Sequence, residues 1–213
     1  FAQWHFPFEH KEVLADNYPA DFICEGVDQT RGWFYTLHAI SSLVKEDIID
    51  ELNNANLPTN NVDGRAYKTV VSNGLVLDKY GNKMSKRLGN TIDPFDTIDT
   101  YSADATRWYL MTNASPWDNL KFDLDGIKEV QRKFFGTLYN TYQFFALYAN
   151  VDGFDFSEKY ISVNERPEID RWILSSLHSL IKTVTENLDN YEPTLAFRAV
   201  EEFLDEHLSN WYV

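Results

Sequence analysis

The 213-residue sequence predicts an α/β segment followed by an all-α helical bundle. Two apolar or β-branched runs in the first third are separated by an amphipathic stretch, which is typical of strand, helix and strand. Near residues 112–122 the strand-like runs stop, and apolar residues then recur every three or four positions. A hydrophobic content of 44% with 15% aromatic residues indicates a folded globular protein.

The α/β segment is expected to contain one βαβ unit. A short apolar run at 20–25, closed by Gly26, predicts the first strand. Apolar residues at helical intervals predict one helix from 30 to about 51, and the Asn-, Pro- and Gly-rich stretch 53–64 predicts a loop. The β-branched run 66–72 predicts a second strand, which should lie parallel to the first because a helix connects them.

Helices are expected from there on. Asp93-Pro94 opens one, and a second covers about 103–111 before a connector at Trp117. Three amphipathic helices then form the bundle, and they should begin near Asp123 or Asp125, at Pro167 and at Leu195. Their aromatic stripes, which include Phe145 and Tyr148, are expected to be core and not a cofactor-binding face.

Charge and cysteine usage limit the function classes. A net charge of -14 argues against nucleic-acid binding by this chain alone, because such binding depends on neutralising phosphates. One cysteine, Cys24, excludes an internal disulfide and a multi-cysteine zinc site, which fits the cytoplasm. No apolar run approaches the roughly 20 residues of a membrane span, so no membrane partner is expected.

The segment 79–87 is an exception to the overall acidity. It holds Lys79, Lys83, Lys86 and Arg87 and no acid. Gly81 allows a tight turn, so the segment predicts a cationic loop that could meet a polyphosphate. From charge alone, a solvated surface turn is the commoner explanation. Little apolar anchoring is visible within the loop, so it is expected to be mobile.

The residues of this loop carry a family resemblance. The segment 83–87, Lys-Met-Ser-Lys-Arg, resembles the KMSKS signature of class I aminoacyl-tRNA synthetases, with Arg87 in place of the usual final serine. The flanks at 73–78, 88–94 and 101–110 resemble those of the isoleucine, valine and leucine members. The segment 25–34, Glu-Gly-Val-Asp-Gln-Thr-Arg-Gly-Trp-Phe, is most similar to the isoleucine members.

The resemblance implies a domain organisation. Residues 1–116 would be the second half of a Rossmann-like catalytic nucleotide-binding domain, and residues 117–213 part of a helical anticodon-binding domain. No HIGH motif is present in the 213 residues, and the editing insertion has no counterpart. The chain is therefore expected to be a piece of a longer enzyme and to be inactive when isolated.

The same resemblance implies site residues. Lys83, Ser85 and Lys86 would act on the triphosphate, and Arg87 would add a further cation for a phosphate. Nucleotide-binding roles would fall to residues at the two strand ends and in the loop: Glu25, Gly26, Asp28, Gln29, Asn73, Gly74, Val76 and Met84.

The individual roles differ. Glu25 and Asp28 would hold the ribose, and Gln29 the aminoacyl-phosphate region. The backbone of 73–76 would lie against the adenine, with Met84 over the ring. Trp33 would line the amino-acid pocket. From the residues alone, Glu25 and Asp28 could equally be a helix cap and a solvated acid, and Trp33 could be core.

The implied reaction is ATP-dependent activation of isoleucine, followed by transfer to tRNA(Ile). Mg²⁺ would accompany the ATP, with no metal site built from protein side chains, and a monomer is expected. Two alternatives stay open: a non-catalytic module for tRNA or protein binding, and an enzyme specific for valine or leucine.

Overall fold

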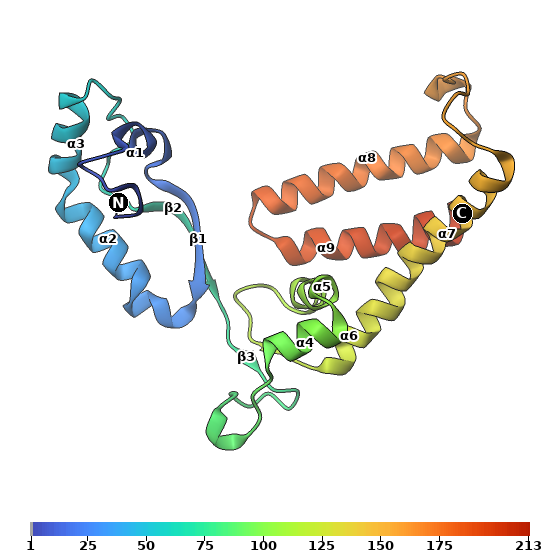
Figure 1. Cartoon of the computed structure of the whole chain (residues 1–213), viewed down its shortest axis with the longest axis horizontal. Coiled ribbons are helices and arrows are strands. Elements are labelled where there is room, and N and C mark those ends of the chain that lie inside the picture. The colour runs from blue at the N-terminus through green and yellow to red at the C-terminus, as the bar shows by residue number, and fades with distance from the viewer. Residues whose placement is uncertain (1) are drawn as a thin grey trace. The chain divides into compact units, whose positions relative to one another are not determined.

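A computed structural model describes residues 2–213 of the chain (Figure 1). They form two compact units, one ending at Leu75 and the other running Val76–Val213. This division follows the packing of the chain. The expected domain limits, 1–116 and 117–213, rest on the resemblance and stay a prediction.

The first unit contains the predicted βαβ unit. Strands β1 (Ala20–Gly26) and β2 (Tyr67–Asn73) pair in parallel. Helices α2 (Trp33–Leu43) and α3 (Lys45–Asn54) connect them. Helix α2 packs on β2 through Phe34 and Tyr67, whose ring centroids lie 6.4 Å apart. The expected strands and their parallel pairing are confirmed.

The prediction of one continuous helix from 30 to about 51 is wrong. A 3₁₀ turn (Val27–Arg31) precedes α2, and Val44 separates α2 from α3. Backbone bonds still cross the interruption, because Val44 N donates to Ile40 O and Ile48 N donates to Val44 O, both at 3.0 Å. The interruption is therefore a local kink, at a residue whose side chain packs against the hydrophobic core of this unit.

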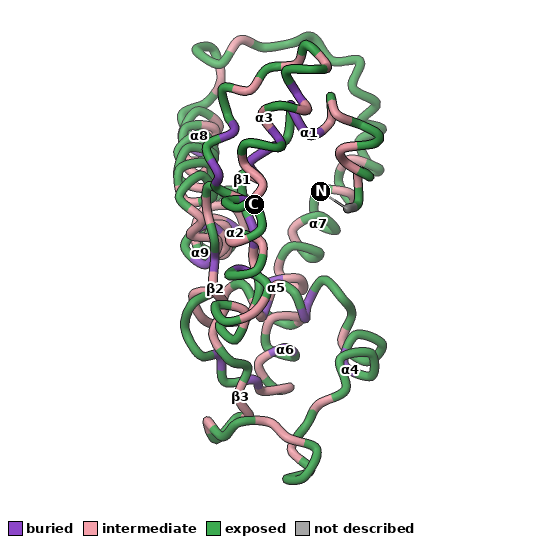
Figure 2. The backbone as a smooth tube through the Cα atoms, turned by 90° about the vertical axis from the view of Figure 1, so that its left-hand side faces the viewer, coloured by how far each residue is buried: buried purple, intermediate pink, exposed green. Residues whose placement is uncertain are grey.

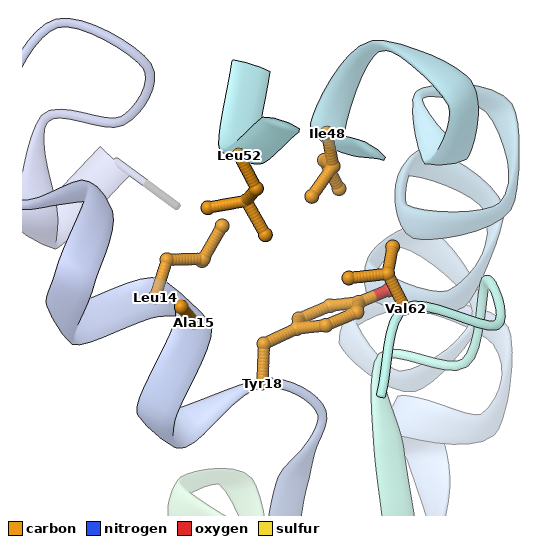
Figure 3. Close-up of a cluster of buried hydrophobic side chains, with 6 residues drawn as sticks. All are labelled: Leu14, Ala15, Tyr18, Ile48, Leu52 and Val62. Atoms are coloured by element: carbon orange, nitrogen blue, oxygen red, sulfur yellow. The ribbon is translucent and has the colours of Figure 1, made fainter. Parts of the chain in front are cut away.

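That core forms between α3 and a further helix, α1 (Lys11–Asn17), which the sequence did not predict. A 3₁₀ turn at Ala2–Trp4 precedes α1. Figure 3 shows Leu14 of α1 and Leu52 of α3 pointing toward one another, with Tyr18 beside them. The Tyr18 hydroxyl is hydrogen-bonded to Ser41 of α2, which satisfies both buried hydroxyls.

The second unit begins with a short parallel pair. Strand β3 (Val76–Leu77) pairs with β4 (Leu120–Lys121), and α4 (Pro94–Tyr101) and α5 (Ala103–Asn113) lie between them in sequence. Helix α4 begins at Pro94 as expected. Asp93 caps it, since its Oδ1 accepts from Phe95 N at 2.8 Å. Strand β4 was not predicted, because two residues are too few to produce a period-2 pattern.

The bundle follows. Its elements are α6 (Leu124–Val130), a π-helical turn (Gln131–Phe135), α7 (Gly136–Asp152), a 3₁₀ turn (Val163–Glu165), α8 (Glu168–Asp189), α9 (Pro193–Glu202) and a π-helical segment (Phe203–Tyr212). Of the two candidate caps for α6, Asp123 fills the role, because its Oδ1 accepts from Asp125 N at 3.1 Å. Helices α8 and α9 lie side by side (Figure 1).

Helix α9 holds the end of α5. The Trp108 ring stacks on Phe134 with centroids 3.9 Å apart, and its Nε1 donates to Glu201 of α9 at 2.7 Å. Arg198 Nε donates to Thr112 O at 2.9 Å, which satisfies a carbonyl that the helix end leaves free. These contacts join α5 to the bundle.

The expectation that the aromatic stripes are core is wrong for α7. None of its residues is buried, and Phe145 and Tyr148 are 53% and 52% exposed. The ring of Phe145 contacts Phe154 of the following loop, with centroids 6.3 Å apart, and that contact leaves about half of its surface exposed. In the same stripe Ile127 and Phe134 are buried, because Ile127 packs in a core with Ala105 and Tyr109 of α5 and Phe134 stacks on Trp108 of α5.

Candidate functional site

The first group of predicted site residues lies where β1 and β2 end. Gly26 and Asn73 are register partners, so the carboxyl ends of the two strands are adjacent. Ligands of open parallel sheets bind beyond this edge. Glu25 is exposed there, and its side chain makes no hydrogen bond or ion pair within residues 2–213. Its carboxylate is therefore free to accept hydrogen bonds from a ligand.

The glycine at the end of β1 lies close to the carboxylate of Asp28. A Cβ on Gly26 would lie 2.7 Å from Asp28 Oδ1, so a side chain would displace that carboxylate. Asp28 is exposed, and its other oxygen accepts from Gln29 Nε2 at 3.1 Å. In this structure the group that lies close to the Gly26 backbone is therefore the Asp28 carboxylate.

Gln29 has a structural role in this conformation. Its Oε1 accepts from Trp33 N at 2.9 Å and so caps α2. Trp33 is 43% exposed and contacts Phe34, with centroids 6.1 Å apart. Because much of the Trp33 surface is exposed, this residue is not simply part of the core, and its exposed part could line a pocket.

Asn73 at the end of β2 is engaged with the only cysteine. Its Nδ2 lies 3.1 Å from the Cys24 sulfur, which in turn donates to its Oδ1 at 3.4 Å. Gly74 follows, and Val76 begins the second unit with 48% of its surface exposed. The Asn73 side chain therefore links the two strand ends, which leaves its backbone as the part that can meet a ligand.

The second group lies on the cationic loop after β3. Asp78 organises the start of this loop: its Oδ1 accepts from Tyr80 N at 3.0 Å and from Asn82 N at 2.8 Å. Its Oδ2 accepts from Asn90 Nδ2 at 3.0 Å and from Asn82 Nδ2 at 3.3 Å. The hydrogen bonds from Asn90 and Asn82 hold the pKa of the Asp78 carboxyl below its usual value. The four N–H donors around Asp78 therefore favour its ionised form.

The loop presents its cations to solvent. Lys83, Lys86 and Arg87 are exposed and form no ion pair within the described part of the chain. The segment 76–96 contains no buried residue and is mainly green in Figure 2. Ser85 serves as a cap, because its Oγ accepts from Leu88 N at 3.3 Å and starts the 3₁₀ turn Lys86–Leu88.

Met84 packs within the second unit, and its expected place over an adenine stays a prediction. Its side chain is half-buried against the core of the second unit, which is formed by Ala105, Tyr109, Leu120, Phe122 and Ile127. The loop therefore has one apolar anchor, which agrees with the expectation of little apolar anchoring. The mobility prediction itself stays untested.

Two cavities lie within the second unit. The larger, about 870 Å³, is lined by five carboxylates and two cations. Its excess of acids makes it unsuitable for a phosphate. The smaller, about 370 Å³, adjoins the base of the cationic loop and is lined in part by Asp78, Lys79 and Asn90.

Residues 2–213 contain no group of three or more His, Cys, Asp and Glu side chains that could hold a metal ion. No helix among them is both long enough and apolar enough to cross a membrane.

Sequence reasoning gave no role to two residues of the site, Asp78 and Asn90. Asp78 had a detectable signal, because an Asp followed by a Gly-containing turn commonly bonds the backbone two residues on. Asn90 had none, since its partners lie five, seven and twelve residues away.

Two family models match the chain. Residues 1–123 match "tRNA synthetases class I (I, L, M and V)", and residues 170–213 match "Anticodon-binding domain of tRNA ligase".

Curated relatives match the whole chain. An isoleucine–tRNA ligase of Bacteroides fragilis is 60% identical over 215 residues, and one of Cytophaga hutchinsonii is 60% identical over 213. One of Thermus thermophilus is 43% identical over 213 residues. The matches cover 100% of this chain but 17%, 18% and 19% of these relatives, so the chain spans less than a fifth of their length.

Solved structures show the same fold at low identity. The LeuRS of Agrobacterium radiobacter, in a ternary complex with tRNA and LeuAMS, matches with a TM-score of 0.72 at 20% identity. The match covers 92% of this chain and 24% of that one. Mycobacterium tuberculosis methionyl-tRNA synthetase with methionyl-adenylate matches with a TM-score of 0.66 at 21% identity, over 95% of this chain and 36% of the other.

Proposed function

Because the chain belongs to the class I tRNA synthetases of the isoleucine, leucine, methionine and valine group, we propose that it is part of an isoleucine–tRNA ligase. The full-length parent would activate isoleucine with ATP and transfer it to tRNA(Ile). The observation that carries this proposal is the loop with three exposed and unpaired cations, Lys83, Lys86 and Arg87. The 60% identity to isoleucine–tRNA ligases supports the choice of amino acid.

In the proposed reaction the isoleucine carboxylate attacks the α-phosphorus of ATP. A carboxylate oxygen–phosphorus bond forms, and the bond from the α-phosphorus to the bridging oxygen breaks, so that pyrophosphate leaves. Negative charge moves onto the leaving oxygens. Lys86 and Lys83 would stabilise it, because their ammonium groups have no ion-pair partner within residues 2–213. Arg87 would add a planar donor for a phosphate.

Mg²⁺ would bring further positive charge to the triphosphate. The loop side chains are cations and fit the phosphates, not the metal. The ion would therefore be held mainly by phosphate oxygens and water, as is usual for Mg²⁺.

The remaining assignments are proposals of the same kind. Glu25 and Asp28 would accept from the ribose hydroxyls, which the exposure of both carboxylates supports. Gln29 would donate to the aminoacyl phosphate from Nε2, the nitrogen that donates to Asp28 in this conformation. The backbone at Asn73, Gly74 and Val76 would lie against the adenine. Trp33, with its exposed indole, would line the isoleucine pocket.

Residues 1–116 would belong to the catalytic domain and residues 117–213 to the anticodon-binding domain. The limits of the two family matches, 123 and 170, support this order. We also propose that the parent is a cytoplasmic monomer.

The test is isoleucine-dependent ATP–pyrophosphate exchange by the full-length parent. Lys86→Ala should lower kcat on the order of 100-fold, the cost typical of losing one charge-stabilising donor. KM for isoleucine should stay within about twofold, because the ammonium acts on the phosphates and not on the amino acid. Lys159→Ala, at an exposed lysine in the loop after α7, is the matched control.

The outcomes separate the alternatives. Loss of isoleucine affinity with kcat unchanged would contradict the role of Lys86. Faster exchange with valine or leucine would change the amino acid and keep the reaction. No exchange with any of the three would favour a non-catalytic module.

A further inference from the structure

The side chains of Asp78 and Asn90 close the cationic loop at its two ends. We propose that this pair, the Asp78–Asn90 clasp, positions Lys83 and Lys86 for phosphate chemistry. The inference rests on the proposed function for its catalytic consequence. The clasp itself rests on hydrogen bonds within the second unit, and it can be tested independently of activity.

Asp78 forms the first half of the clasp. Both carboxylate oxygens accept two N–H groups each, from Tyr80, Asn82 and Asn90. Two of these donors are backbone amides of the turn, and the donor from Asn90 lies twelve residues along the chain. One anionic side chain therefore shapes the turn and ties it to the far end of the loop.

Asn90 forms the second half. Its Oδ1 accepts from Ser85 N at 2.9 Å, and its Nδ2 donates to Lys83 O at 3.4 Å as well as to Asp78. One amide thus holds both ends of the tripeptide 83–85. A three-point attachment of this kind fixes the backbone from which Lys83 extends.

The position of Lys86 follows from the same attachment. Ser85, held by Asn90, caps the 3₁₀ turn that begins at Lys86. Both lysines therefore extend from backbone that Asn90 places, although neither side chain contacts the clasp. Asp78 and Asn90 are positioning residues, and the lysines are the groups that would touch substrate.

Polar contacts dominate here because apolar ones are few. No residue from 76 to 96 is buried, and within 79–89 Met84 alone packs against the core of the second unit. Loss of the clasp should therefore release the loop without unfolding the core around Ile127. This separates a positioning role from a general structural one.

Reciprocal substitutions test the pairing. In Asp78→Asn, one oxygen can still accept the turn amides, but a new NH₂ group opposes the NH₂ group of Asn90. In Asn90→Asp, two carboxylates face each other. The double variant Asp78→Asn with Asn90→Asp restores a donor–acceptor pair between positions 78 and 90 and retains the acceptor for Ser85 N. It lacks the donor to Lys83 O, so the rescue should be partial. Asn164→Asp, at an exposed asparagine in the 3₁₀ turn Val163–Glu165, is the control.

Two readouts are measured on the full-length parent. The first is isoleucine-dependent ATP–pyrophosphate exchange. Each single variant should lower kcat by about 10- to 100-fold, as expected for a misplaced catalytic group, with KM for isoleucine within about twofold. The double variant should have a higher kcat than either single variant, which additive structural damage would not produce.

The second readout is the rate of trypsin cleavage after Lys83, Lys86 and Arg87. It should rise in the single variants and fall again in the double variant, with the melting temperature of the parent unchanged. Cleavage rates equal to wild type in both single variants would overturn the clasp, whatever the activity.

Faster cleavage with unchanged kcat in an active parent would overturn the positioning role. An inactive wild-type parent would contradict the proposed function, and the cleavage readout would still decide whether the clasp exists.

Discussion

Gly126 in α6 offers a sharp test of the packing beneath the cationic loop. A Cβ at this position would lie 2.4 Å from Tyr109 Cε2 and 3.1 Å from its Cζ. The ring cannot easily move, because its hydroxyl donates to Lys121 O at 3.0 Å and accepts from Asp123 N at 3.1 Å. These bonds hold β4, the strand that pairs with β3 directly before the loop.

The magnitude for Gly126→Ala follows from competing effects. Alanine would gain at most about 1 kcal/mol from its higher helix propensity. Overpacking at a contact of this kind costs about 1–3 kcal/mol, and each hydrogen bond lost from a displaced Tyr109 hydroxyl adds about 0.5–1.5 kcal/mol. The variant should therefore lower the free energy of unfolding by about 1–3 kcal/mol.

The assay is urea unfolding of the 213-residue chain followed by far-UV circular dichroism, with separate transitions fitted for the two units where they resolve. Gly136→Ala is the matched control. Gly136 has helical dihedral angles of -63° and -44°, and a Cβ there would meet only Gln131 O at 3.4 Å. That variant should be neutral or stabilised by up to about 1 kcal/mol.

The result that would refute the reasoning is equal behaviour of the two variants. If Gly126→Ala matched or exceeded the stability of wild type, the Tyr109 ring would be free to move aside. The hydroxyl could not then be the fixed point that holds β4.

Two further predictions concern stability. Leu52→Ala should cost about 2–5 kcal/mol in urea unfolding, because Leu52 is 0% exposed. Leu43→Ala, at an 83% exposed position, should change stability by less than about 0.5 kcal/mol, and similar losses in both would contradict the assigned core. The Asp78 carboxyl carbon should titrate below 3.8 in an NMR titration. A lowered pKa means that the native state binds fewer protons, so this stabilisation is present above about pH 4 and declines as the pH falls through the native pKa. Titration at or above 3.8 would contradict the bonds from Asn90 and Asn82.

Local patterns in the sequence predicted most of the elements. The parallel pairing of β1 and β2 followed from strand, helix and strand in succession. The Asp93-Pro94 start of α4 and the three bundle helices were equally visible. These signals are local in origin, since caps and periodicity depend on residues a few positions apart.

The errors came from contacts between distant segments. The kink at Val44 occurs within an apolar period that continues across it, and the two-residue strand β4 exists because β3 lies beside it. Phe145 and Tyr148 are exposed for a related reason. An apolar stripe indicates which face of a helix can be buried, but it does not indicate whether another element covers that face.

The candidate site divides in the same way. The sequence identified the cations of the loop and the acids at the end of β1, because residue type and spacing carry that information. Tertiary structure alone decided which groups are free and which are used: Lys83 and Lys86 are unpaired, whereas Gln29 caps a helix and Asn73 contacts Cys24. The proposed role of Asp78 and Asn90 also depends on tertiary structure. The two residues are twelve positions apart in the sequence, and only folding brings Asn90 Nδ2 to 3.0 Å from Asp78 Oδ2.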